Sequence, residues 1–224
     1  MKYLFTLAFM LFECFAFAQV GNENISFSTG NFFMRANRPT TIEYVIDGSP
    51  YMNSKHFEMV TVLGYSSNVQ NLRYNAYADE MEFEHGGQIY YANKEEGLKI
   101  EFKDFQKTYQ ILNYSYDNKN RFGYLVVLLE HPRYSLYKRE KIELLKGEKS
   151  PSTFKKDDND YYAKEKDLYL VKKDLQYFKF PKNNKEFIAQ CALDKSNFEK
   201  FLKTNKLSFS KEADMIQMIE FTNR

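Results

Sequence analysis

Alternation between polar and apolar residues is the main pattern in the first two thirds of the chain, and it predicts β-strands. From Leu72 to Asp79, and again from Glu80 to Glu84, every second side chain is apolar or small, which is typical of a strand with one face in water. Turn residues separate such runs at roughly ten-residue intervals, and no helical pattern lies between them. This order favours antiparallel hairpins, built into a sandwich or a curled sheet, over an alternating strand–helix fold.

Further runs complete the expected sheet. Tyr124 to Leu129 is apolar on both faces, so we expect a central strand that is covered from both sides. A strand over 108–116 precedes it across the polar loop 117–120, and a strand over 133–142 follows Pro132. The segment 40–46 is expected to form an earlier strand, before a turn at 47–50.

The last part of the chain changes to a helical period. Phe187 and Cys191 share one helical face, and the same spacing recurs around Phe198 and around Ile216. Asp194 and Ser210 stand where N-caps of the last two helices are expected. We therefore predict an α+β fold, an antiparallel β-rich body with a small C-terminal helical tail packed on the sheet. The expected organisation is a signal peptide (1–18), the β body (19–150), a loop and short hairpin (151–173), and the helical tail (174–224). The two strands of the hairpin are expected at 161–162 and 168–171.

The first residues have the pattern of a secretory signal peptide. Lys2 precedes an apolar run, and Ala16-Phe17-Ala18 forms a cleavage site of the A-x-A type. The run is too short to span a membrane, and no later segment is long enough either. Cleavage after Ala18 would leave Gln19 as the first residue of a periplasmic or secreted protein. The alternative is a lipoprotein signal acylated at Cys14, which Glu13 disfavours.

Composition limits the partners and the sources of stability. Of the 2 cysteines, only Cys191 follows the signal, so no disulfide can form within the processed chain. We expect Cys191 to be a buried thiol, and the alternative is a disulfide to another molecule. The net charge of +2 gives no reason to expect nucleic acid as a partner. The chain has 18 Tyr and 21 Phe, and tyrosine combines a large contact area with a polar tip. The residues predicted to form a binding surface are Tyr74, Tyr77, Phe102, Tyr114 and Tyr124.

No grouping along the sequence matches a catalytic or metal site. His56, His85 and His131 lack zinc-ligand spacing, and neither nucleophile nor nucleotide-binding motifs occur, so no cofactor is expected. The acidic residues of 80–84 alternate on a strand and are expected to form a row facing water. Asp157, Asp158 and Asp160 are expected to solvate a loop.

Several segments resemble uncharacterised secreted proteins of Bacteroidetes. They are 72–83 (LRYNAYADEMEF), Gly48-Ser49-Pro50-Tyr51, Tyr134-Ser135-Leu136-Tyr137-Lys138-Arg139, and the tail motifs at 198–207 and 212–216. Phe221-Thr222-Asn223 departs from the Tyr-Asn that usually closes the tail. The resemblance covers most of the processed chain and implies a Gram-negative envelope or secreted location. It implies no activity and no functional residues.

These observations favour a non-enzymatic exported envelope protein that acts as a binding or interaction module, with an envelope protein, a glycan or a lipid as its partner. The alternative is a carrier of a lipid or another apolar ligand, in a sheet cavity lined by Phe102, Tyr114 and Tyr124. A third hypothesis is a hydrolase whose carboxylates, such as Asp79 and Glu82, are dispersed along the chain.

Overall fold

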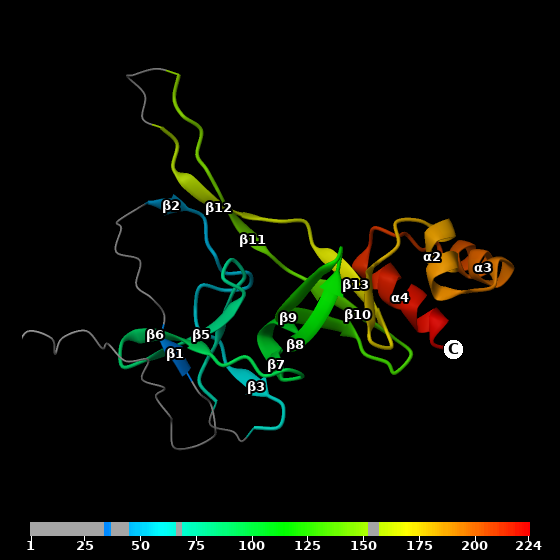
Figure 1. Cartoon of the computed structure of the whole chain (residues 1–224), viewed down its shortest axis with the longest axis horizontal. Coiled ribbons are helices and arrows are strands. Elements are labelled where there is room, and N and C mark those ends of the chain that lie inside the picture. The colour runs from blue at the N-terminus through cyan, green and yellow to red at the C-terminus, as the bar shows by residue number, and fades with distance from the viewer. Residues whose placement is uncertain (1–33, 37–44, 66–68, 152–156) are drawn as a thin grey trace, which may run out of the picture.

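Mostly antiparallel strands, with one parallel pair, and three helices after them build the part of the chain that the computed structural model describes (Figure 1). This part comprises residues 34–36, 45–65, 69–151 and 157–224. The predicted α+β class, with a β-rich body and C-terminal helices, is therefore confirmed. The predicted signal peptide and most of the strand predicted at 40–46 lie outside the described residues.

The largest sheet of the described residues has the strand order β14-β13-β10-β9-β8-β7-β3. The long hairpin of β8 and β9 turns at Asp117 and Asn118, which both have positive φ angles. As predicted, the run from Tyr124 to Leu129 lies in a central strand, β9. The strands are β3 (Val60–Val62), β7 (Lys99–Phe102), β8 (Lys107–Tyr116), β9 (Lys119–Leu129), β10 (Tyr134–Arg139), β13 (Leu168–Lys173) and β14 (Gln176–Lys179), with the 3-10 turn η1 (Lys103–Phe105) between β7 and β8.

Two smaller sheets complete the body. One has the order β1-β6-β5-β4, and the other joins β11, β12 and β2. In Figure 1, β11 and β12 extend away from the large sheet as an arm, on the side opposite the helices. The strands are β1 (Met34–Ala36), β2 (Ile46–Asp47), β4 (Arg73–Asn75), β5 (Glu80–His85), β6 (Gln88–Ala92), β11 (Ile142–Leu145) and β12 (Asp160–Lys164).

A tight turn at 76–79 interrupts the alternation that predicted strand structure up to Asp79. The Asn75 side chain accepts a hydrogen bond from the backbone N–H of Ala78 at 3.0 Å, and Asp79 has a φ of 55°. Asparagine and aspartate tolerate such turns better than other residues that carry a Cβ. The segment is thus a hairpin of β4 and β5, whose turn places Asp79 against the large sheet.

Two predictions about strand pairing and helix extent were wrong. β12 pairs with β11 and β2, whereas β13 pairs with β10 and β14, so 161–162 and 168–171 form no hairpin with each other. The segment predicted as the helical tail begins with β14, because residues 176–179 continue the antiparallel pairing of β13. The helices α2 (Asn184–Cys191), α3 (Lys195–Asn205) and α4 (Glu212–Thr222) follow.

The helices pack on the outer face of β9, β10 and β13, as expected. Phe187 and Phe198 stack there at 4.8 Å between ring centroids, and Cys191 is buried beside them. Asn223 follows α4 and binds both the N–H and the C=O of Tyr134 in β10. Within the described residues, no helix is long and apolar enough to cross a membrane.

Only one of the two predicted helix caps is confirmed. The Asp194 side chain accepts a hydrogen bond from the N–H of Asn197 at the start of α3. The prediction for Ser210 was wrong, because Lys211 is the N-cap residue of α4 and makes no side-chain capping bond. Asp214, in the first turn of α4, instead accepts a hydrogen bond from the N–H of Ser208.

The acidic row of β5 does not face water as a whole, which corrects the sequence prediction. Glu82 is 2% exposed and accepts hydrogen bonds from Arg73 and Asn75, each at 2.8 Å. Glu80 is also buried and lies 3.7 Å from the Lys94 ammonium, whereas Glu84 is exposed. The two buried carboxylates are tolerated because cations on neighbouring segments compensate their charge.

Candidate functional site

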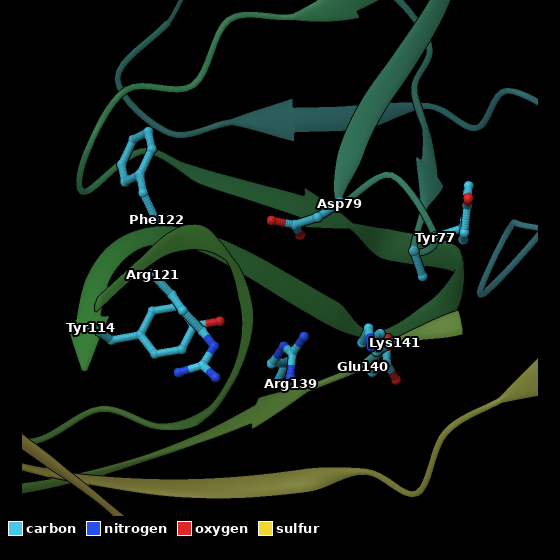
Figure 2. Close-up of a pocket in the computed structure, with 9 residues that line it drawn as sticks. Tyr77, Asp79, Tyr114, Arg121, Phe122, Arg139, Glu140 and Lys141 are labelled. Atoms are coloured by element: carbon cyan, nitrogen blue, oxygen red, sulfur yellow. The ribbon is translucent and has the colours of Figure 1, made fainter. Parts of the chain in front are cut away.

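An open cleft of about 320 Å³ lies where the 76–79 turn, the β8–β9 hairpin and the end of β10 meet (Figure 2). We call it the arginine cleft. It is lined by Ala76, Tyr77, Asp79, Tyr114, Arg121, Phe122, Arg139, Glu140 and Lys141.

The antiparallel pairing of β9 with β10 places the two arginines on the same face of the large sheet. Tyr114 and Arg121 are directly opposite each other in the β8–β9 register, and the ring of Tyr114 contacts that of Tyr177 on β14. This face therefore presents Arg121 from β9 and Arg139 from β10 to the same cleft. Figure 2 shows both guanidinium groups pointing into the cleft.

Tyr116 holds both guanidinium groups. The Cζ atom of Arg121 lies 3.9 Å from the centroid of the Tyr116 ring, and its Nη1 donates to the carbonyl oxygens of Tyr116 and Lys119. Nη1 of Arg139 donates to the Tyr116 hydroxyl at 3.0 Å. Both guanidinium groups therefore contact the same tyrosine side chain, Arg121 at its ring face and Arg139 at its hydroxyl.

The carboxylates that line the cleft, Asp79 and Glu140, are paired with lysines and not with the two arginines. Asp79 pairs with Lys94 at 3.2 Å, and Glu140 pairs with Lys107 at 2.8 Å. In the described part of the chain, neither Arg121 nor Arg139 forms a salt bridge. The cleft therefore carries two cations that form no salt bridge with a described residue, although the charge of Arg139 also acts on the carboxylate of Glu143.

Asp79 is fixed in place by its backbone and by its partners. Its carboxylate accepts hydrogen bonds from the Tyr74 hydroxyl at 2.8 Å and from the N–H of Tyr124 at 3.3 Å. A Cβ atom at Gly123 would lie only 2.2 Å from Oδ2 of Asp79. Glycine at position 123 thus allows the 76–79 turn to approach β9 and form one wall of the cleft.

Two ionisable groups of the cleft are held in one protonation state near neutral pH. Burial raises the pKa of Tyr114 to about 12, and the nearby charge of Arg139 only partly opposes this shift. Burial alone would raise the pKa of Glu140, but hydrogen bonds from Lys107 and Tyr109 and the charges of Lys107 and Lys138 hold it below the usual value. Tyr114 therefore stays a neutral hydroxyl, and Glu140 stays an anion.

The five residues predicted to bind a partner occupy different environments. Tyr74, Phe102 and Tyr124 are buried in the core between the sheets, where they pack against Tyr109 and one another. Tyr114, 6% exposed, lines the arginine cleft, and Tyr77, 47% exposed, lies at its rim. Only these two meet at one site. Phe102 and Tyr124 fill the core, so they do not line the ligand cavity that the lipid-carrier hypothesis assigned to them.

Arg121 and Arg139 were missed at the sequence level. Arg121 lies between the predicted loop 117–120 and the predicted strand that begins at Tyr124, and Arg139 stands between two charged residues on the strand predicted over 133–142, so neither drew attention as a site residue. One signal was available, because the tight hairpin at 117–118 sets Arg121 opposite Tyr114. The convergence of Arg139 with Arg121 depends on the pairing and register of β9 and β10, which the sequence pattern does not specify.

The remaining candidate groups lie outside the cleft. His56, His85 and His131 are exposed, and the described residues contain no cluster of three or more potential metal ligands. Asp157 and Asp158 are exposed as predicted. The prediction for Asp160 was wrong, because its carboxylate is buried and accepts hydrogen bonds from Lys146 and from the N–H of Gly147.

No known protein family, curated protein or solved structure matches this chain. The resemblance to secreted proteins of Bacteroidetes therefore stays a prediction.

Proposed function

We propose that this chain is an exported, non-enzymatic binding module of the bacterial envelope that holds its partner in the arginine cleft. The observation that carries the proposal is the pair of arginines, Arg121 and Arg139, which share one cleft without a carboxylate partner among the described residues. The cleft volume of about 320 Å³ lies at the lower end of the range for ligand pockets.

The protonation states around the cleft support binding rather than acid–base chemistry. A general acid or base is most effective when its pKa lies near the working pH. The pKa values of Tyr114 and Glu140 are shifted away from neutrality, in opposite directions. These groups therefore present fixed hydrogen-bonding partners and fixed charge to whatever enters the cleft.

A photo-crosslinking amino acid at position 77 tests this proposal in the intact envelope. We expect a specific adduct there, because Tyr77 lies at the cleft rim, and none at position 161, a tyrosine of similar exposure on the β12 arm. Mass spectrometry of the same protein should find Gln19 as its first residue. Equal labelling at both positions, or no adduct at position 77, would contradict the proposal.

A second candidate function, lipid carriage, is favoured by a different cleft. Between β13, the 180–182 segment and α4 lies an open space of about 520 Å³, larger than the arginine cleft. Tyr169, Phe180, Phe209 and Met215 line it, and Lys166 and Lys182 border it. Native mass spectrometry of the purified protein with added palmitate tests this function, and a Met215→Glu variant should lose any bound lipid. An absence of bound lipid in both proteins would exclude palmitate as cargo.

A further inference from the structure

We propose that the arginine cleft binds the oxyanion of an acidic glycan, a carboxylate or a sulfate carried on a sugar ring. The inference rests on the proposed function, since it names the ligand class for the same cleft. Its starting point is the close approach of two like charges, which repel each other when no anion lies between them.

The two arginines are arranged to receive an oxyanion. The planar guanidinium group presents several N–H donors in a fixed fork that matches carboxylate and sulfate-like groups. Among the described residues, the hydrogen bonds of Arg121 and Arg139 use only Nη1 of each guanidinium group, which leaves Nε and Nη2 to donate to a ligand. Tyr116 keeps both groups in position, which lowers the entropy lost when a ligand binds.

Tyr114 and Tyr77 extend the site beyond the charge. In Figure 2 the hydroxyl of Tyr114 points toward the space between Arg121 and Arg139. Its raised pKa keeps this hydroxyl protonated, so it can donate a hydrogen bond to a sugar hydroxyl or an oxyanion. Tyr77 lies at the other end of the cleft, and its exposed ring is supported edge-on by Tyr162 at 5.3 Å. An exposed aromatic face packs well against the C–H groups of a sugar ring.

The strands under the cleft favour a glycan over an extended peptide. A peptide commonly binds by pairing with a free strand edge. β8, β9 and β10 are each paired on both sides, so none of them offers such an edge. The cleft is also open and lined largely by charged residues, whereas a lipid tail needs an apolar enclosure.

Calorimetric titration at low salt tests the assignment with defined probes. We expect heat of binding with a galacturonic acid trimer or with a sulfated maltotriose, and none with unmodified maltotriose. A carboxylate ligand is indicated if the galacturonate probe binds more tightly, and a sulfate ligand if the sulfated probe does. A tri-glutamate peptide that bound as tightly as the better glycan would overturn the glycan assignment.

Matched substitutions connect the affinity to the cleft. Arg121→Gln and Arg139→Gln should each weaken binding about tenfold or more, since a charge-assisted hydrogen bond typically contributes that much. Arg133→Gln removes the same charge from an exposed position elsewhere and should change affinity less than about twofold. Arg139→Lys keeps the charge without the fork and should give an intermediate loss. Near-ultraviolet circular dichroism checks that each variant is folded.

The outcomes separate this inference from the proposed function. No binding of either acidic probe, together with a specific adduct at position 77, would refute the glycan inference and leave the binding module standing. No binding and no adduct would refute both. Equal losses in Arg133→Gln and in the cleft variants would show that net charge, rather than the cleft, attracts the probes.

Discussion

The contact between Gly123 and Asp79 makes the arginine cleft sensitive to a single methyl group. In a Gly123→Ala variant the new Cβ would lie 2.2 Å from Oδ2 of Asp79, far inside van der Waals contact. The carboxylate cannot rotate away freely, because it accepts hydrogen bonds from the buried Tyr74 hydroxyl, from the N–H of Tyr124 and from Lys94. Overpacking costs about 1–3 kcal/mol, and a buried donor that loses its acceptor costs about 1–3 kcal/mol more.

We therefore expect Gly123→Ala to lower the free energy of unfolding by about 2–6 kcal/mol, measured by urea denaturation. The matched background is Asp79→Gly, which removes the obstructing carboxylate and suits the positive φ of that position. In this background the Gly123→Ala substitution should lower the free energy of unfolding by less than about 1 kcal/mol. A difference of this kind between the two backgrounds is expected only if residues 79 and 123 are in direct contact. An equal cost in both backgrounds would refute the proposed contact.

Three further predictions concern the buried groups around the cleft and under the helices. The pKa of Glu140 in the folded protein lies below its ordinary value of 4.5, so the stabilisation from its carboxylate is complete above that pH and is lost as the pH falls below it. Urea denaturation between about pH 5 and 3 should therefore show a smaller decrease in unfolding free energy for Glu140→Gln than for the unmodified protein. Cys191, whose pKa burial raises to about 11, should react with Ellman's reagent only when urea unfolds the chain, and rapid labelling of the native protein would contradict its burial. Phe187→Ala should cost about 3–5 kcal/mol of unfolding free energy because its ring is fully buried against Phe198, while the control Phe122→Ala, at a 43% exposed position, should cost less than about 1 kcal/mol.

The sequence predicted the elements of this fold better than their pairing. The alternation around β5 to β9 and the helical period after residue 184 identify strands and helices because each reflects which side of an element is buried. The pairing of β12 with β11 rather than with β13 was not predictable from alternation, since two strands that follow each other can join different sheets. β14 was missed because Gln176–Lys179 is too short for its period to be distinguished from the helical pattern that follows.

The site was predicted only in part, for a related reason. The high tyrosine content led to the prediction of a tyrosine-lined binding surface. The sequence did not distinguish the tyrosines that are buried in the core, Tyr74 and Tyr124, from those that line the cleft, Tyr77 and Tyr114. A carboxylate such as Glu82 was expected in water because its partner, Arg73, lies on the neighbouring strand and becomes adjacent only through strand register. Long-range pairing therefore determines both the buried charges and the binding surface.

Observing the guanidinium groups during a titration tests the central claim most directly. The Nε–Hε resonances of Arg121, Arg139 and the exposed Arg133 can be assigned by substitution and followed by nuclear magnetic resonance as the galacturonate trimer or the sulfated maltotriose is added. We expect saturable shifts for Arg121 and Arg139 with the same dissociation constant, and no saturable shift for Arg133. Uniform small shifts of all three resonances, or none with either probe, would contradict it.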